Sequence, residues 1–237
     1  MQTTATSSQP SQEASQLSPL QRYARAGRAL RKILAQPEDT DQVLVFLGLL
    51  NHGPQIEARV RRFLSHPGGQ KLYDERRAID SRTVDLDALG ALPEGTLGHA
   101  YATFLRSRGL TPQTFDGPPP GITDPRQSYM IQRMRQTHDL WHVVTACDTD
   151  PAGEVALQAF TYAQVGAPGN AVLAVAGLLR GIGRDPGIVG DTLRMYRLGR
   201  RARLLAVFDW ETHWATPLAE VRAMLGLPRA SAARAQA

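Results

Sequence analysis

Apolar residues recur three and four positions apart along most of this chain, with polar residues between them. This spacing is typical of helices that bury one face. The stretches that show it cover residues 20–34, 43–50, 55–64, 97–108, 155–165, 170–179 and 188–208, and a further long helix begins at residue 125. Proline, glycine or a capping polar residue stands at most of their boundaries. Because no run alternates in the manner of a strand, the pattern predicts an all-α fold, a single multi-helix domain over residues 20–228.

The two ends of the chain differ in composition from this helical part. Residues 1–17 hold Ser, Thr, Gln and Ala with one acidic and no basic residue, which is the composition of a disordered tail. A signal peptide needs a charged start and an apolar core, and a transit peptide carries arginine, so neither is expected. We predict a disordered polar tail over residues 1–19 and a flexible tail over residues 229–237.

The strongest chemical signal is an H-D-x-x-H motif formed by His138, Asp139 and His142, with Glu154 twelve positions after the second histidine. On a helix the two histidines lie on one face, and the aspartate lies at the edge of the same arc. Residues 148–153 contain turn and capping residues, a proline and a glycine, so a second helix can fold back and present the glutamate. Two imidazoles and two carboxylates form a full ligand set for a divalent cation. The sequence therefore predicts a metal site between two helices.

A second interpretation of the same residues remains open. Asp139 and the two histidines could form a buried polar network, while Glu154 complements the dipole at the start of its helix.

Charge and hydropathy restrict the partners. Lys and Arg number 27 against 22 Asp and Glu, which gives a net charge of +5. This mild excess is compatible with an anionic membrane surface or a phosphate-bearing ligand, and we expect no nucleic-acid partner. Arginines cluster on the helices at 20–34 and 188–208, where a solvated face is the simpler interpretation. The most hydrophobic run, residues 43–50, is shorter than the ~18 to 20 residues that span a bilayer, so it is either buried or in contact with lipid.

Several other reactive residues are expected to be structural. The single cysteine, Cys147, excludes an internal disulfide and lies away from the ligand face of its helix. His52 and His66 stand in breaks between helices and are expected to be loop or cap residues. The acidic and histidine residues at 209–213 surround tryptophans and are expected to border the core rather than form a second ligand cluster.

Segments spread along the chain together resemble the Coq-four family of ubiquinone (coenzyme Q) biosynthesis proteins. The similar segments are Leu-Pro-x-Gly-Thr-Leu-Gly at 92–98 with Ala-Tyr at 100–101, Gly-Leu-Thr-Pro at 109–112, Gln-Arg-x-Arg at 132–135, His-Asp-x-Trp-His at 138–142, Gly-Glu at 153–154, and residues 217–227. The resemblance covers about residues 20–228, and H-D-x-x-H with the later glutamate is the family's hallmark.

The resemblance implies an all-helical, commonly dimeric protein that associates peripherally with membrane. It implies that His138, Asp139, His142 and Glu154 are the metal-binding and catalytic residues, with zinc as the usual metal and iron, manganese or cobalt also possible. The family is implicated in removing the C1 carboxyl group of a polyprenylated quinone precursor, coupled to hydroxylation there, and in organising other quinone biosynthesis enzymes. With no targeting character in residues 1–19, we expect a bacterial protein in the cytoplasm, at the inner membrane.

Three classes of function agree with the motif and its neighbouring residues. Arg133 and Arg135 could steer an acidic headgroup, and an apolar groove for the tail could involve residues 43–50. The leading hypothesis is a metal-dependent decarboxylase. The second is a non-catalytic, lipid-binding scaffold in which the metal is structural. The third is a metal hydrolase, which is disfavoured because aspartate replaces the glutamate base of the protease helix.

Overall fold

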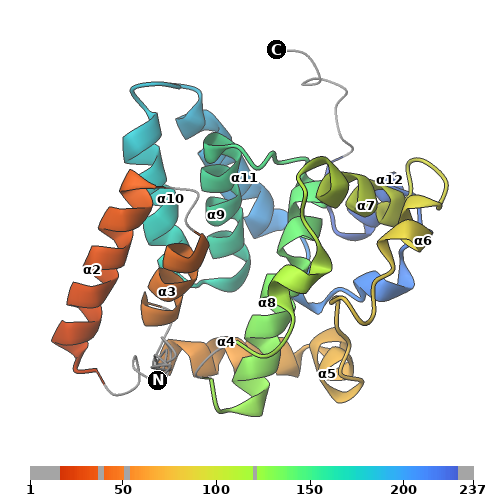
Figure 1. The fold of residues 1–237 in the computed structure, drawn as a ribbon, viewed down its shortest axis with the longest axis horizontal. Coiled ribbons are helices and arrows are strands. Elements are labelled where there is room, and N and C mark those ends of the chain that lie inside the picture. Colours follow the sequence, from red (N-terminus) through yellow and green to blue (C-terminus); the bar gives the residue numbers. More distant parts are fainter. Residues whose placement is uncertain (1–16, 37–39, 51–53, 120–121, 229–237) are drawn as a thin grey trace, which may run out of the picture.

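The computed structural model describes residues 17–36, 40–50, 54–119 and 122–228, and within them the chain is all-helical (Figure 1). In this part of the chain the only β-type pairing is an isolated bridge between Thr96 and Pro217. The predicted all-α, single-domain fold is confirmed. The predicted tails lie outside the described residues apart from residues 17–19, where Ser18 caps a helix that begins at Pro19, and His52 also lies outside them.

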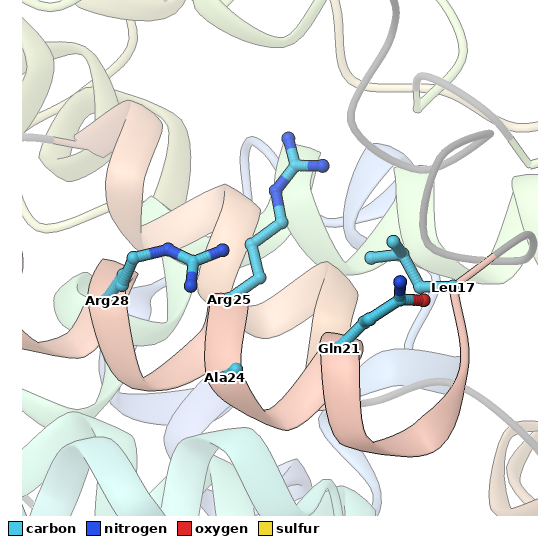
Figure 2. Close-up of a pocket in the computed structure, with 5 residues that line it drawn as sticks. All are labelled: Leu17, Gln21, Ala24, Arg25 and Arg28. Atoms are coloured by element: carbon cyan, nitrogen blue, oxygen red, sulfur yellow. The ribbon is translucent and has the colours of Figure 1, made fainter.

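A first group of helices forms one side of the molecule in Figure 1 and consists of α2 (Pro19–Ala35), α3 (Thr40–Leu50) and α10 (Pro168–Gly181). A capping box at Ser18 and Gln21 begins α2. Its buried residues include Ala26 and Ile33, which pack in one apolar cluster with residues of α3 and α10. Another face of α2 carries Arg25 and Arg28; the side chain of Arg25 points away from the helix and that of Arg28 lies along it (Figure 2). The predicted basic amphipathic helix is therefore present.

The central helices are α8 (Pro125–Thr145), α9 (Pro151–Val165) and α11 (Ile188–Arg201). Helices α9 and α11 approach closely at Gly199, where an added Cβ would lie only 2.7 Å from the carbonyl oxygen of Phe160. The main apolar cluster gathers around α8 and α9, and Trp141, Leu157 and Phe160 are fully buried within it.

The remaining elements surround α8 on the other side and below (Figure 1). They are α4 (Pro54–Ser65), α5 (Pro67–Asp74), α6 (Leu86–Gly90), α7 (Leu97–Ser107) and α12 (Leu218–Met224), with short 3-10 turns η1 (Pro112–Phe115), η2 (Leu205–Val207) and η3 (Trp210–Thr212). Thr96 caps α7, since its Oγ1 accepts a hydrogen bond from the amide of His99 at 3.4 Å. No helix among the described residues has the length and apolar character needed to cross a membrane.

The structure contains short helices that the sequence did not predict, and one predicted helix is shorter than expected. The helix predicted over 55–64 is α4, and α5 follows it at Pro67 because His66 caps α5 through a hydrogen bond from the Gly68 amide to Nδ1 at 3.1 Å. Helix α6 lies between residues 64 and 97, where no helix is predicted. The helix predicted over 188–208 ends at Arg201, because Gln164 on α9 binds the carbonyl oxygen of Gly199 at 2.7 Å and the amide of Leu205 at 2.8 Å.

Candidate metal centre

Helix α8 carries three of the four predicted ligands. Asp124 caps its start, since its Oδ1 accepts hydrogen bonds from the amides of Arg126 at 2.8 Å and Gln127 at 3.0 Å, and Pro125 occupies the first turn. The helix ends at Ala146, which adopts a left-handed conformation with φ of 54°. The chain reverses there, and His142 stands in the last turn of α8 beside the reversal.

The turn after α8 places Glu154 opposite the two histidines. Asp150 caps α9 through a hydrogen bond from the Gly153 amide at 2.7 Å. Gly153 is required for the close approach, because an added Cβ would lie 2.1 Å from the carbonyl oxygen of Asp148. The predicted turn residues therefore bring the first turn of α9 against the last turns of α8.

The donor atoms of His138, His142 and Glu154 all lie within 4.8 Å of one another. Nε2 of His142 is 3.2 Å from Oε1 of Glu154, and the two imidazole rings meet edge to face with centroids 4.8 Å apart. Asp139 stands beside this cluster, with its Oδ1 3.3 Å from Nδ1 of His138. The structure thus brings three predicted ligands to one point and places the fourth next to the first.

The hydrogen bonds of His142 suit a metal ligand. Its Nδ1 lies 3.0 Å from the carbonyl oxygen of Cys147, and a carbonyl can only accept, so Nδ1 carries the proton. Nε2 is then the ring nitrogen left to bind a cation. That atom is buried and has no partner in hydrogen-bond geometry, despite its short distance to Glu154. The ring is held on one side by Phe104, which stacks on it at 5.6 Å. A ring nitrogen that is oriented in this way and faces a carboxylate fits a divalent cation.

Electrostatics at the cluster also favour positive charge. Burial acts to lower the pKa of His138, but the hydrogen bond with Asp139 and the charges of Glu154 and Asp139 outweigh it and raise that pKa above its usual value. A site that attracts a proton in this way also attracts a metal cation, which competes for the same nitrogen.

His138, Asp139 and Glu154 lie in the wall of a cavity of about 1550 Å³, whereas His142 is buried beside them and is not part of the lining. One face of α8 lines it in sequence from Met130, Ile131 and Met134 to Arg135, His138 and Asp139. The opposite walls come from α2, α3, α4, α9 and α10 and are largely apolar. The cavity is therefore an apolar chamber with a polar, candidate metal-binding end.

Comparison with known proteins identifies the family. The sequence profile described as Coenzyme Q (ubiquinone) biosynthesis protein Coq4 matches residues 12–231. The chain belongs to the Coq4 family. It is similar to the mitochondrial ubiquinone biosynthesis protein COQ4 of Coprinopsis cinerea, with 31% identity over 85% of this chain and 69% of that protein. It is also similar to the mitochondrial COQ4 homolog of Rattus norvegicus, with 31% identity over 88% of this chain and 79% of that protein.

A solved structure has a similar fold. A crystal structure of a Nostoc punctiforme PCC 73102 protein, provisionally assigned to ubiquinone biosynthesis, is 29% identical to this chain. It covers 86% of this chain and 97% of its own length, with a TM-score of 0.70. The predicted family resemblance is confirmed.

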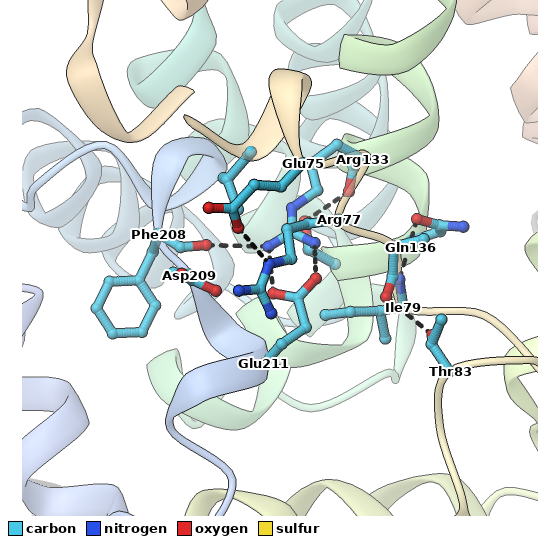
Figure 3. A network of polar contacts seen from close by, with 12 residues as sticks. Glu75, Arg77, Ile79, Thr83, Arg133, Gln136, Phe208, Asp209 and Glu211 are labelled. Carbon is cyan, nitrogen blue, oxygen red and sulfur yellow. Dashed lines mark hydrogen bonds and ion pairs between the residues drawn. The ribbon is translucent and has the colours of Figure 1, made fainter. Parts of the chain in front are cut away.

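Two other sequence predictions concern residues near the motif. Arg135 lines the cavity one turn before His138. Arg133 does not, and the expectation that it steers a headgroup is wrong. Its side chain is fully buried and pairs with Glu211, with Nη2 at 2.8 Å from Oε2 (Figure 3). Helical geometry explains the difference, because positions 133 and 135 lie about 200° apart around α8.

The remaining predictions for polar residues can also be placed. The residues at 209–213 border the core as expected: Trp210 is fully buried, and His213 stacks on Phe208 with ring centroids 4.9 Å apart. Cys147 donates a hydrogen bond to the carbonyl oxygen of Gly153 at 3.0 Å.

The sequence did not predict a role for Arg59 and Arg62, which line the cavity from α4. No local pattern marks them, since α4 reaches the chamber only through tertiary packing.

Proposed function

We propose that this Coq4-family chain is a metal-dependent enzyme of ubiquinone biosynthesis. The proposed reaction releases the C1 carboxyl group of a polyprenylated ring as carbon dioxide and places a hydroxyl group at that carbon, with dioxygen as the two-electron oxidant that is reduced to hydrogen peroxide. One observation carries the proposal: His138 and Glu154 line the polar end of a large apolar cavity, and their donor atoms form one cluster with that of the buried His142. An amphiphile with a long apolar tail and a small, polar, aromatic head matches this shape and polarity.

The order of side chains along α8 supports a direction for the bound molecule. Met130, Ile131 and Met134 line the cavity first and suit a flexible prenyl tail. Val43, Leu44, Val45, Leu47 and Gly48 of α3 line the same chamber, which supports the proposal that this apolar run contacts the tail. The tail then extends along α8 toward its N-terminus, and the head rests against Arg135 and His138.

The residues at the polar end divide into two roles. His138, His142 and Glu154 would hold the cation, and Asp139 would either complete the ligand set or orient His138 through its Nδ1. When bound, a divalent cation supplies charge stabilisation for the carboxylate and phenolate oxygens, and a redox metal such as iron suits a hydroxylation better than zinc. Arg135 would bind the acidic head, since a guanidinium pairs well with a carboxylate.

A second candidate function is a non-catalytic scaffold that presents quinone precursors to other biosynthetic enzymes. The observation that favours it is a row of exposed arginines on α11, at positions 194, 197, 200 and 201. Such a face can dock an acidic partner protein. This proposal predicts that substitution of the ligands abolishes complex assembly rather than turnover.

A turnover assay separates the two proposals. Purified protein is incubated under air with a short-chain prenylated hydroxybenzoate in detergent, in the presence of added iron, manganese, cobalt or zinc, and products are identified by mass spectrometry. The enzyme proposal predicts loss of the carboxyl group with wild-type protein and none with His142→Ala. Arg61→Gln, an exposed change outside the cavity, serves as the matched control and should retain turnover. Absence of turnover with every metal, or equal turnover by His142→Ala, contradicts the enzyme proposal.

A further inference from the structure

Helix α10 exposes a continuous apolar stripe to solvent. Val172, Val175, Leu179 and Ile182 are 37%, 57%, 75% and 48% exposed. Their spacing of three, four and three residues places them on one side of the helix. An exposed row of four large apolar side chains is unfavourable in water and typically marks an interaction surface.

The stripe adjoins the surface end of the cavity. Leu34 at the end of α2 and Arg180, Gly181 and Arg184 at the end of α10 all line the chamber. Leu34 is 37% exposed and both arginines are exposed, so the cavity wall reaches the surface between these two helix ends. Figure 1 shows the C-terminal ends of α2 and α10 next to each other, and the two helices are in contact.

Charges around the stripe are predominantly positive. Lys32 stands in the last turn of α2, and Arg180 and Arg184 flank the end of α10. The acidic residue among positions 179–187 is Asp185, whose Oδ1 accepts a hydrogen bond from the Gly187 amide at 2.9 Å. An apolar stripe with a cationic border complements a bilayer whose surface carries anionic headgroups.

We propose that the exposed face of α10, with the end of α2, docks on an anionic lipid bilayer and forms a portal from the membrane into the cavity. Leu179 and Ile182 enter the acyl region, while Lys32, Arg180 and Arg184 contact headgroups. An apolar chain then passes between the helix ends past Leu34 without crossing water. The docking goes beyond the proposed function and does not depend on it, because binding to vesicles requires neither metal nor substrate.

The test uses an introduced tryptophan as a depth probe. Leu179→Trp and Leu193→Trp are made in the full chain, the second as a matched control because Leu193 on α11 is 46% exposed and lies outside the stripe. Two of the three native tryptophans, Trp141 and Trp210, are fully buried and should be quenched little. Each variant is mixed with vesicles of phosphatidylcholine and phosphatidylglycerol, with and without brominated acyl chains. The proposal predicts strong quenching at position 179 and none beyond the wild-type background at 193.

Vesicle co-flotation provides an independent measurement. The double variant Leu179→Ser with Ile182→Ser should partition at least tenfold more weakly than wild type, because two leucine-sized side chains no longer enter the lipid. Leu193→Ser should bind as wild type does. Arg180→Gln with Arg184→Gln should lose affinity on anionic vesicles at low salt and should show little change on neutral ones.

Two results would overturn the proposal. The first is absence of quenching at position 179; if position 193 is quenched instead, the docking face lies on α11. The second is unchanged flotation of the double serine variant; if that variant also changes from dimer to monomer in light scattering, the stripe is an interface between two copies of the chain. Failure of the turnover assay with intact vesicle binding would reject the proposed chemistry alone.

Discussion

The buried ion pair between Arg133 and Glu211 gives a quantitative prediction about how α8 is held. The guanidinium of Arg133 is fully buried and contacts both carboxylate oxygens of Glu211, and its Nη2 also donates to the carbonyl oxygen of Phe208 at 3.0 Å (Figure 3). Because this arginine lies five positions before His138, the pair fixes the ligand-bearing helix against η3. The substitution Glu211→Ala leaves a cation in the core without its carboxylate.

The expected cost is large. Removing one partner of a buried pair typically destabilises a protein by about 3–5 kcal/mol, because the remaining charge is uncompensated. In a domain of this size, about 1 kcal/mol lowers the melting temperature by ~2–4 °C. Glu211→Ala should therefore lower the melting temperature by roughly 6–20 °C. Replacing both residues with apolar ones, Arg133→Met with Glu211→Leu, should recover most of that loss, since no buried charge remains.

Thermal unfolding followed by circular dichroism measures these shifts. The control is Asp87→Ala, which removes a carboxylate paired with Arg106 on the surface, where Asp87 is 98% exposed. Exposed pairs contribute little, so the control should unfold close to the wild-type temperature. A drop for Glu211→Ala no larger than that of the control would refute the reasoning. A double variant less stable than Glu211→Ala would do so as well.

Three further predictions concern the site and the turn that builds it. Burial raises the pKa of Cys147 to about 12. Iodoacetamide should therefore alkylate native protein at pH ~8 about three orders of magnitude more slowly than protein unfolded in urea. Similar alkylation rates would contradict the burial of the Cys147 thiol. The pKa of His138 is raised above its ordinary ~6.5, so protons should begin to displace cobalt(II) from the protein above that pH. The apparent affinity for cobalt(II), titrated at several pH values, should therefore fall on acidification. An affinity that does not depend on pH would exclude His138 as a ligand. Gly153→Ala places a Cβ 2.1 Å from the Asp148 carbonyl oxygen, so it should lower the free energy of unfolding in urea by about 1–3 kcal/mol and weaken metal binding. The control Gly27→Ala, with no atom within 4 Å of the new Cβ, should leave that free energy unchanged or raise it by up to ~1 kcal/mol. Equal effects of the two substitutions would contradict the close packing of the turn.

Local signals in the sequence were sufficient for most of the fold. Pro125 and Pro151 begin α8 and α9, and Asp124 and Asp150 cap them through side-chain hydrogen bonds. These signals act within one turn of helix, so they can be recognised from the sequence alone. The proximity of Glu154 to the histidines followed from the same local argument.

The errors arose where distant contacts decide the outcome. No capping residue or proline directly after Arg201 marks the end of α11 in the sequence. The helix ends there because the side chain of Gln164, more than thirty positions earlier, accepts a hydrogen bond from the amide of Leu205. The burial of Arg133 likewise depends on a partner 78 positions away. Arg133 and Arg135 nevertheless lie on opposite sides of α8, so the helical spacing alone predicts that only one of the two arginines can face the ligands.

The central claim is that His138, His142 and Glu154 bind a divalent metal, and elemental analysis of purified protein tests it most directly. Wild type, His142→Ala and the control His66→Ala, which alters a histidine that caps α5, are expressed in medium supplemented with iron, zinc, manganese and cobalt. We expect about one metal ion per chain in wild type and in His66→Ala, and loss of that metal in His142→Ala with helicity retained in circular dichroism. Metal retained by His142→Ala at unchanged stoichiometry, or absent from wild type in every medium, would show that these residues do not form a metal site.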